Sequence, residues 1–187
     1  MGTRKQAVLD AIDAANAQDP NFEDGQPAEL LYGQRMSAEL DRLFPDASDA
    51  LQIAARGQHV ERWKLKRSEY PEGRAGYLAW RKAQGVYHAN VVQGFMEQAE
   101  YGADQIEAVG QMLRKQGIKR NAEVQALEDV ICFVFLNWYF APFAAKHSDE
   151  KIQRIVEKTA FKMSAEGRAR VLDEFDLPEA LAEAFRG

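Results

Sequence analysis

Hydrophobic positions recur at helical spacing along almost the whole chain, whereas the alternation typical of strands is nearly absent. The first such stretch predicts a helix over residues 3–17, and the polar residues 19–26 that follow are typical of a loop. Pro27 suits the first turn of a second helix, and Pro45 ends it. The pattern therefore predicts an all-α protein.

Caps and helix breakers divide the rest of the chain. Ser48 is predicted to cap a third helix that continues to about Trp63, and a polar connector follows it. Asp104 and Glu107 form a capping-box pattern. The further predicted helices cover 74–101, 104–116, 122 to a kink or end at Pro142, 148–163, and a last short pair beginning at Ser164 and Pro178. We expect a single domain over residues 1–187, with about seven to nine helices.

The composition of the chain argues against several classes of protein. The 187 residues are 46% hydrophobic and 28% charged, which is typical of a globular chain. A net charge of −5 argues against a surface that binds nucleic acid throughout. Cys132 is the only cysteine, so an internal disulfide cannot form. The N-terminus lacks a signal-like segment, and the apolar stretch 130–145 is short for a membrane span, so we expect a cytoplasmic protein with no membrane partner.

One region is basic within this acidic chain. Residues 56–82 hold eight Lys or Arg and three Asp or Glu, a net charge of +5. Arginine can bind a phosphate through two hydrogen bonds simultaneously, and the aromatic side chains between these basic residues can stack on a nucleobase. The region is equally consistent with a solvated connector. The candidate ligand-binding residues are Arg56, Arg62, Arg74, Arg81 and Tyr77.

Two histidines and an aspartate are the candidates for metal binding. His59 and His88 fall on predicted helices among core-facing positions, and Asp129 stands immediately before the apolar run of the helix predicted from residue 122. Imidazole and carboxylate together suit a divalent ion such as Mn, Fe, Co, Ni or Zn, which activates water or polarises a phosphoryl oxygen. The alternative is structural: hydrogen-bonded core histidines, and an aspartate that caps or pairs locally.

The order of these features resembles the HD-domain phosphohydrolases. That superfamily is all-helical, with a metal-binding His on one helix, a His-Asp pair on a later one and a final metal-binding Asp. Ala89 stands where the family has the Asp of its pair, and Lys115 lies where many members have another His. The resemblance implies an HD-like core over about 50–145 with packing helices at 1–45 and 148–187. Its matching stretches are 58–60, 87–89, 106–113 and 126–129.

The chain also resembles, over most of its length, a family of uncharacterised bacterial and fungal proteins. The matching stretches are 54–59, 70–77, 127–130, 158–159 and 162–164. Some fungal members carry a glutamyl-tRNA synthetase label. The chain lacks the paired synthetase signatures and their Rossmann strands, so this label predicts no activity here.

These observations predict a phosphohydrolase, or a degenerate derivative, that acts on a small phosphorylated metabolite or nucleotide. His59, His88 and Asp129 would hold the metal ion, Glu128 would activate water and Lys115 would neutralise the phosphate. The alternatives are a non-catalytic module that binds a nucleotide or another anion, an RNA-associated protein, and a helical interaction protein.

Overall fold

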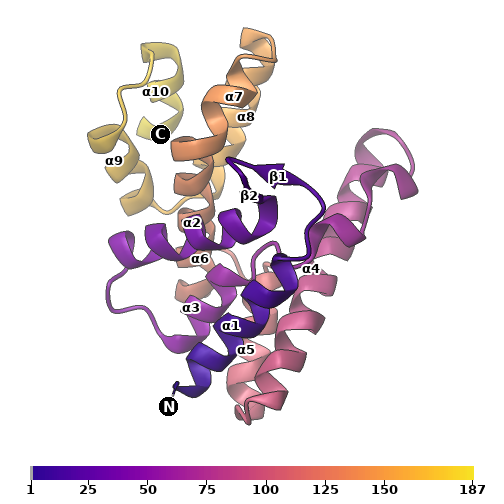
Figure 1. Ribbon diagram of the computed structural model, residues 1–187. Helices are drawn as coiled ribbons and strands as arrows, with labels where there is room; N and C mark the ends of the chain where they lie inside the picture. The colour runs from indigo at the N-terminus through magenta and orange to yellow at the C-terminus, as the bar shows by residue number, and fades with distance from the viewer. Residues whose placement is uncertain (1) are drawn as a thin grey trace. The chain divides into compact units, whose positions relative to one another are not determined.

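The computed structural model describes residues 2–187 and confirms the all-α fold, with ten α-helices among these residues. The chain divides into two compact units, one ending at Gln116 and one beginning at Gly117, and Figure 1 labels the helices of both. The helices of the first unit are α1 (Arg4–Asn16), α2 (Ala28–Leu43), α3 (Asp49–Arg56), α4 (Gly73–Gln98) and α5 (Ala103–Leu113). Those of the second are α6 (Ala122–Val134), α7 (Phe140–Ala144), α8 (Asp149–Lys162), α9 (Ala165–Glu174) and α10 (Glu179–Arg186).

The predicted loop between the first two helices contains a small hairpin. Strands β1 (Phe22–Glu23) and β2 (Gln26–Pro27) pair antiparallel. Asp24 and Gly25 connect them with positive φ angles of 50° and 76°, as a two-residue hairpin turn requires. The hairpin leads directly into α2, so it fixes where that helix begins.

Helix α3 is shorter than its periodicity predicts. Ser48 caps it as expected, by accepting a hydrogen bond from the Leu51 amide, but the predicted continuation to Trp63 is wrong because the helix ends at Arg56. Gly57 follows, and a Cβ there would come within 2.6 Å of Val92 on α4. The chain turns at this close contact and continues into two 3₁₀ turns, η1 (Arg62–Lys64) and η2 (Arg67–Glu69).

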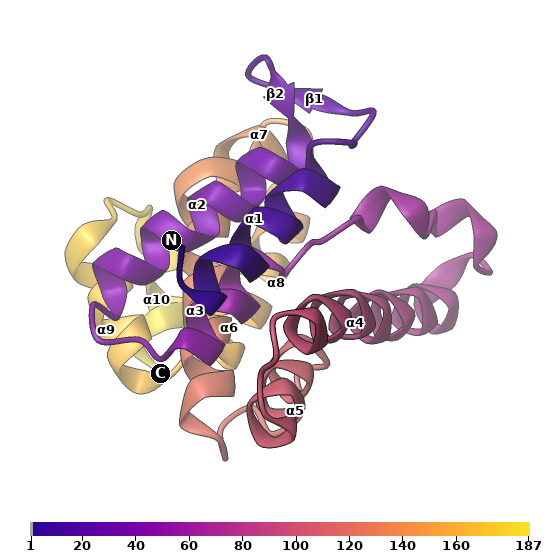
Figure 2. The same cartoon turned by 60° about the horizontal axis from the view of Figure 1, so that its bottom comes forward.

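Helices α4 and α5 lie side by side and form one flank of the first unit (Figure 2). Helix α5 also packs against α3, and α1 packs against both α3 and α4. The predicted capping box of α5 is not formed, since Gly102 is the capping residue and Glu107 pairs with Arg114 instead. Completely buried side chains from several helices form the core of this unit: Val8, Ile12, Met36, Leu40, Ile53, Val92 and Met96.

The second unit begins with the most apolar helix, as predicted. In α6 the single cysteine, Cys132, is buried. A π-helical segment, η3 (Phe135–Tyr139), separates α6 from α7. Pro142 lies in α7 and has no N–H to donate to the carbonyl four residues earlier, so the register changes just before it.

By length and composition alone, the stretch Ala122–Ala144 would be able to cross a membrane. The core helix of a globular protein meets the same criterion, and 44% of the tested window is buried.

Candidate functional site

A pocket of about 300 Å³ opens in the first unit, where α4, the end of α5 and the turn after α3 meet. Five basic side chains line it, and among the described residues no acidic side chain does. The lining residues that carry chemistry are Gln58, His59, Arg62, Arg81, Lys82, Gln84, His88, Arg114, Lys115 and Gln116. The predicted histidines and part of the predicted basic cluster therefore share one cavity.

Neighbouring groups hold three of the basic side chains in place. The Arg62 guanidinium lies over the Trp80 ring, 5.1 Å from its centroid, and Arg81 lies 6.0 Å from the ring centroid of Tyr77. The Arg114 guanidinium donates a hydrogen bond of 2.8 Å to Glu107. Side chains held in this way lose less conformational entropy when they bind a ligand.

Lys115 follows the end of α5 with a φ of +57°, in the left-handed region. This conformation is costly for a residue with a side chain. The strained turn places a lysine at the pocket where glycine would be the ordinary choice.

A half-buried carboxylate contacts the Nδ1 side of the His59 ring. The Nδ1 atom of His59 lies 3.1 Å from Oε2 of Glu29 in the first turn of α2. The ring of Tyr32, one turn further along α2, stacks on the imidazole with 3.7 Å between centroids and 9° between planes. Together the two contacts restrict the position and rotation of the imidazole ring.

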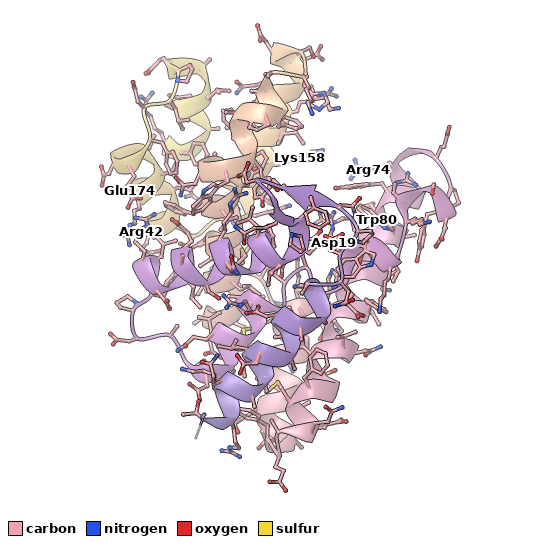
Figure 3. All side chains as sticks on the ribbon, viewed as in Figure 1. Asp19, Arg42, Arg74, Trp80, Lys158 and Glu174 are labelled. Atoms are coloured by element: carbon pink, nitrogen blue, oxygen red, sulfur yellow. The ribbon has the colours of Figure 1, made fainter. Side chains whose placement is uncertain are left out.

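Two residues near the end of α1 position this pair. The buried Asn16 accepts a hydrogen bond from the Glu61 amide just after His59, and it donates one to the Glu29 carbonyl. Asp19 accepts a hydrogen bond from the Glu29 amide, and Figure 3 labels Asp19 near the hairpin. The backbones that carry Glu29 and His59 are thus fixed to the same segment.

Burial and the surrounding cations shift the ionisation of these groups. Burial raises the pKa of Glu29 from 4.5 to about 7, despite the opposing effect of Arg62. Loss of water around the ring, together with Arg62, Lys115 and Arg81, holds the pKa of His59 well below its ordinary value. Burial, and then His59, lower the pKa of His88 to about 3. Both imidazoles are therefore neutral near pH 7.

The second imidazole has a fixed tautomer. The Nδ1 atom of His88 lies 2.8 Å from the Val60 carbonyl oxygen, which can only accept, so Nδ1 carries the proton. Nε2 of the neutral ring is then an acceptor. The centroid of this ring lies 6.2 Å from that of His59.

Two glutamines of the pocket wall carry buried oxygens that, within residues 2–187, have no hydrogen-bond partner. Gln84 is 4% exposed and Gln58 is 6% exposed. Nε2 of Gln84 donates to the carbonyls of Arg62 and Leu65, at 2.9 and 3.1 Å. This fixes the orientation of the Gln84 amide, because a flipped amide would direct its oxygen at two carbonyl oxygens.

Three predicted ligand-binding residues do not line the pocket. The sequence predicts Arg56 as a phosphate ligand, but its guanidinium donates to both carboxylate oxygens of Asp13, at 2.8 and 3.0 Å. Arg74 lies in the first turn of α4, before Trp80 on the same helix (Figure 3). Tyr77 contacts the pocket residue Arg81 and is itself largely exposed.

The predicted acidic residues, Glu128 and Asp129, belong to the second unit. The Asp129 carboxylate accepts hydrogen bonds from the amide and the hydroxyl of Ser164 and from Gln125. Ser164 in turn caps α9. Asp129 therefore makes the local, structural contacts of the alternative interpretation. Glu128 is 3% exposed, and its carboxylate lies 4.0 Å from the Lys162 ammonium.

The donor set of the pocket does not fit a divalent metal ion. Within residues 2–187, no group of three or more His, Cys, Asp or Glu side chains is placed to hold one. The pocket offers two imidazoles, His59 and His88, among five cationic side chains. A divalent cation would be repelled by these charges and would lack a carboxylate ligand in the pocket lining.

Sequence reasoning did not identify five residues of this site: Glu29, Gln58, Lys82, Gln84 and Arg114. An acid in the first turn of a helix, such as Glu29, is ordinarily explained by the helix dipole. Nothing in its local sequence indicates a histidine partner 30 positions away. Lys82 adjoins Arg81, and Arg114 adjoins Lys115, so charge clustering was the one available signal.

A family described as a domain of unknown function, DUF4202, matches residues 6–184, and the chain belongs to that family. No curated protein and no solved structure matches the chain.

Proposed function

We propose that the pocket binds the phosphate group of a small phosphorylated molecule. One observation carries the proposal: among the described residues, five basic and no acidic side chains line a cavity of about 300 Å³. Positive charge concentrated in a concave, partly desolvated site attracts anions more strongly than the same charge on an open surface. Because the whole chain carries a net charge of −5, an anion is attracted to this pocket rather than to the protein surface in general.

The arrangement favours phosphate over a monoanion. Arg62 comes from η1, Arg81 from α4 and Lys115 from the end of α5, so the charges converge from three segments. A phosphate presents several oxygens around one centre and accepts hydrogen bonds from such groups simultaneously.

Calorimetric titration with inorganic phosphate and pyrophosphate tests the binding. Replacement of Arg81 by glutamine removes one charge, and we expect affinity to fall about tenfold, as for loss of one charge-assisted hydrogen bond. Arg74→Gln removes the same charge from the same helix outside the pocket and serves as the matched control. Equal losses in the two variants, or no binding by the unaltered protein, would contradict the proposal.

A second candidate function, hydrolysis of the bound phosphate ester, is favoured by the contact between Glu29 and His59. With Nδ1–H donated to the carboxylate, Nε2 of His59 has a lone pair that can accept a proton from water. The water oxygen would then bond to phosphorus as the ester oxygen leaves and takes a proton from solvent. Lys115 would neutralise charge on the phosphoryl oxygens, as the sequence predicts.

Phosphatase assays with and without a chelator distinguish the outcomes. Turnover that survives chelation and is lost in His59→Gln supports the metal-independent reaction. Metal content of the purified protein, measured beside His59→Ala and His88→Ala, tests the metal-dependent alternative that the HD resemblance implies. Phosphate binding without turnover, under chelation or with added divalent ions, identifies a non-catalytic anion-binding module.

A further inference from the structure

Two glutamine side chains of the pocket lining carry buried hydrogen-bond acceptors, beside the cations of the same lining. Oε1 of Gln84 and Oε1 of Gln58 are buried and, among residues 2–187, have no partner. Each such oxygen destabilises the protein relative to one that accepts a hydrogen bond. Native proteins rarely leave buried acceptors unpaired, and a ligand is one established reason for the exceptions.

The basic side chains of the same pocket do not satisfy these oxygens, although they are rich in donors. For Gln84 the orientation is fixed, because both of its amide hydrogens point to the carbonyls of Arg62 and Leu65. His88 adds a third acceptor at Nε2, since its Nδ1–H is used by the Val60 carbonyl. A ligand that complements the pocket therefore supplies neutral donors as well as an anion.

We propose, on the basis of the phosphate site above, that the ligand is a phosphate ester of a small polyol or sugar. Its hydroxyl groups would donate to Gln58, Gln84 and His88, while its phosphate is held by the basic side chains. Hydroxyls fit better than an ammonium group, because five cations line the same cavity.

The lining also distinguishes a polyol from a nucleotide. Nucleobases are ordinarily held by stacking on aromatic side chains. In the described part of the chain, no Phe, Tyr or Trp lines the pocket. A cavity of about 300 Å³ is at the lower end of the range for small-molecule sites, which suits a compact ligand.

Calorimetry with matched pairs of probes tests the inference on the full chain. Each pair has the same carbon number: glycerol phosphate against propyl phosphate, ribose phosphate against pentyl phosphate, and sorbitol phosphate against hexyl phosphate. We expect at least one polyol phosphate to bind about tenfold more tightly than its alkyl partner, the equivalent of one or two hydrogen bonds. Alkyl phosphates that bind as tightly as every polyol phosphate would overturn the inference.

Substitution of Gln58 by methionine tests the acceptor directly. The preference for the polyol phosphate over its alkyl partner should fall about tenfold, the equivalent of one lost hydrogen bond. Gln98→Met changes an exposed glutamine on α4 and is the matched control. An unchanged preference in a folded Gln58→Met protein refutes the role of the acceptor. If inorganic phosphate itself does not bind, the proposed function fails as well, so the two failures are distinguishable.

Discussion

Replacement of Glu29 by glutamine should raise the stability of the protein several times more at alkaline pH than at pH 5. The folded protein binds the Glu29 proton more tightly than the unfolded chain does, because burial raises the pKa from 4.5 to about 7. Stability therefore decreases as pH rises through this interval, and the loss is complete above it. Glutamine keeps the shape and an acceptor for Nδ1–H of His59, but it cannot ionise.

The size of this stability difference follows from the interval between the unfolded and folded pKa values of Glu29. Each pH unit between the unfolded and folded pKa contributes about 1.4 kcal/mol, so the interval from 4.5 to about 7 sets an upper limit of about 3 kcal/mol. The low pKa values of His59 and His88 act in the opposite direction and stabilise the protein above pH 6.5. They are present in both proteins, so they cancel in the difference.

Urea denaturation followed by circular dichroism at pH 5 and pH 8 measures this difference. Glu97→Gln removes an exposed acid of α4 and should change stability by less than about 0.5 kcal/mol at either pH. If Glu29→Gln lowers stability at pH 8, or shifts it equally at both pH values, then burial of the charged carboxylate does not cost the protein stability and the reasoning is wrong.

Three further substitutions distinguish residues that stabilise the fold from residues that bind phosphate. Lys115→Gly should relieve the left-handed strain and raise stability by about 1 kcal/mol, while calorimetry shows weaker phosphate binding; lower stability would show that the side chain compensates for the strain. Arg56→Met should cost about 1 kcal/mol, because the half-buried Asp13 loses its partner, yet leave phosphate affinity intact; a parallel loss of affinity would show that Arg56 contributes to the site. Asp129→Ala should lower the thermal midpoint by removing the acceptor of the Ser164 amide and hydroxyl, and unchanged melting would exclude a structural role.

Helix starts were predictable because their signals are local. Ser48 accepts a hydrogen bond from an amide three residues later, as the sequence predicts, and Thr3 and Ser148, where two other predicted helices begin, do the same. The hairpin also has a local signal, the pair Asp24 and Gly25, but its strands are too short to show alternation. Locally encoded features can be recovered from one sequence.

Features that depend on long-range contacts were harder to predict. Periodicity carries the third predicted helix past Arg56, but the approach of Val92 to Gly57 ends it there. Periodicity places His59 on a face of that longer predicted helix. In the structure His59 instead lies in the turn after α3, and this turn brings it beside His88. Glu29 reaches the site through the position of α2 against α3, and no spacing in the sequence indicates that contact.

The amide of Gln84 links ligand chemistry to the motion of a backbone segment. Its nitrogen ties the carbonyls of Arg62 and Leu65 to α4, and Trp80 donates a second hydrogen bond to Leu65. A donor bound at the amide oxygen would polarise the same amide and strengthen its N–H bonds to those carbonyls. Occupancy of the pocket should therefore slow hydrogen–deuterium exchange in the connector that follows α3, even at amides that no ligand touches.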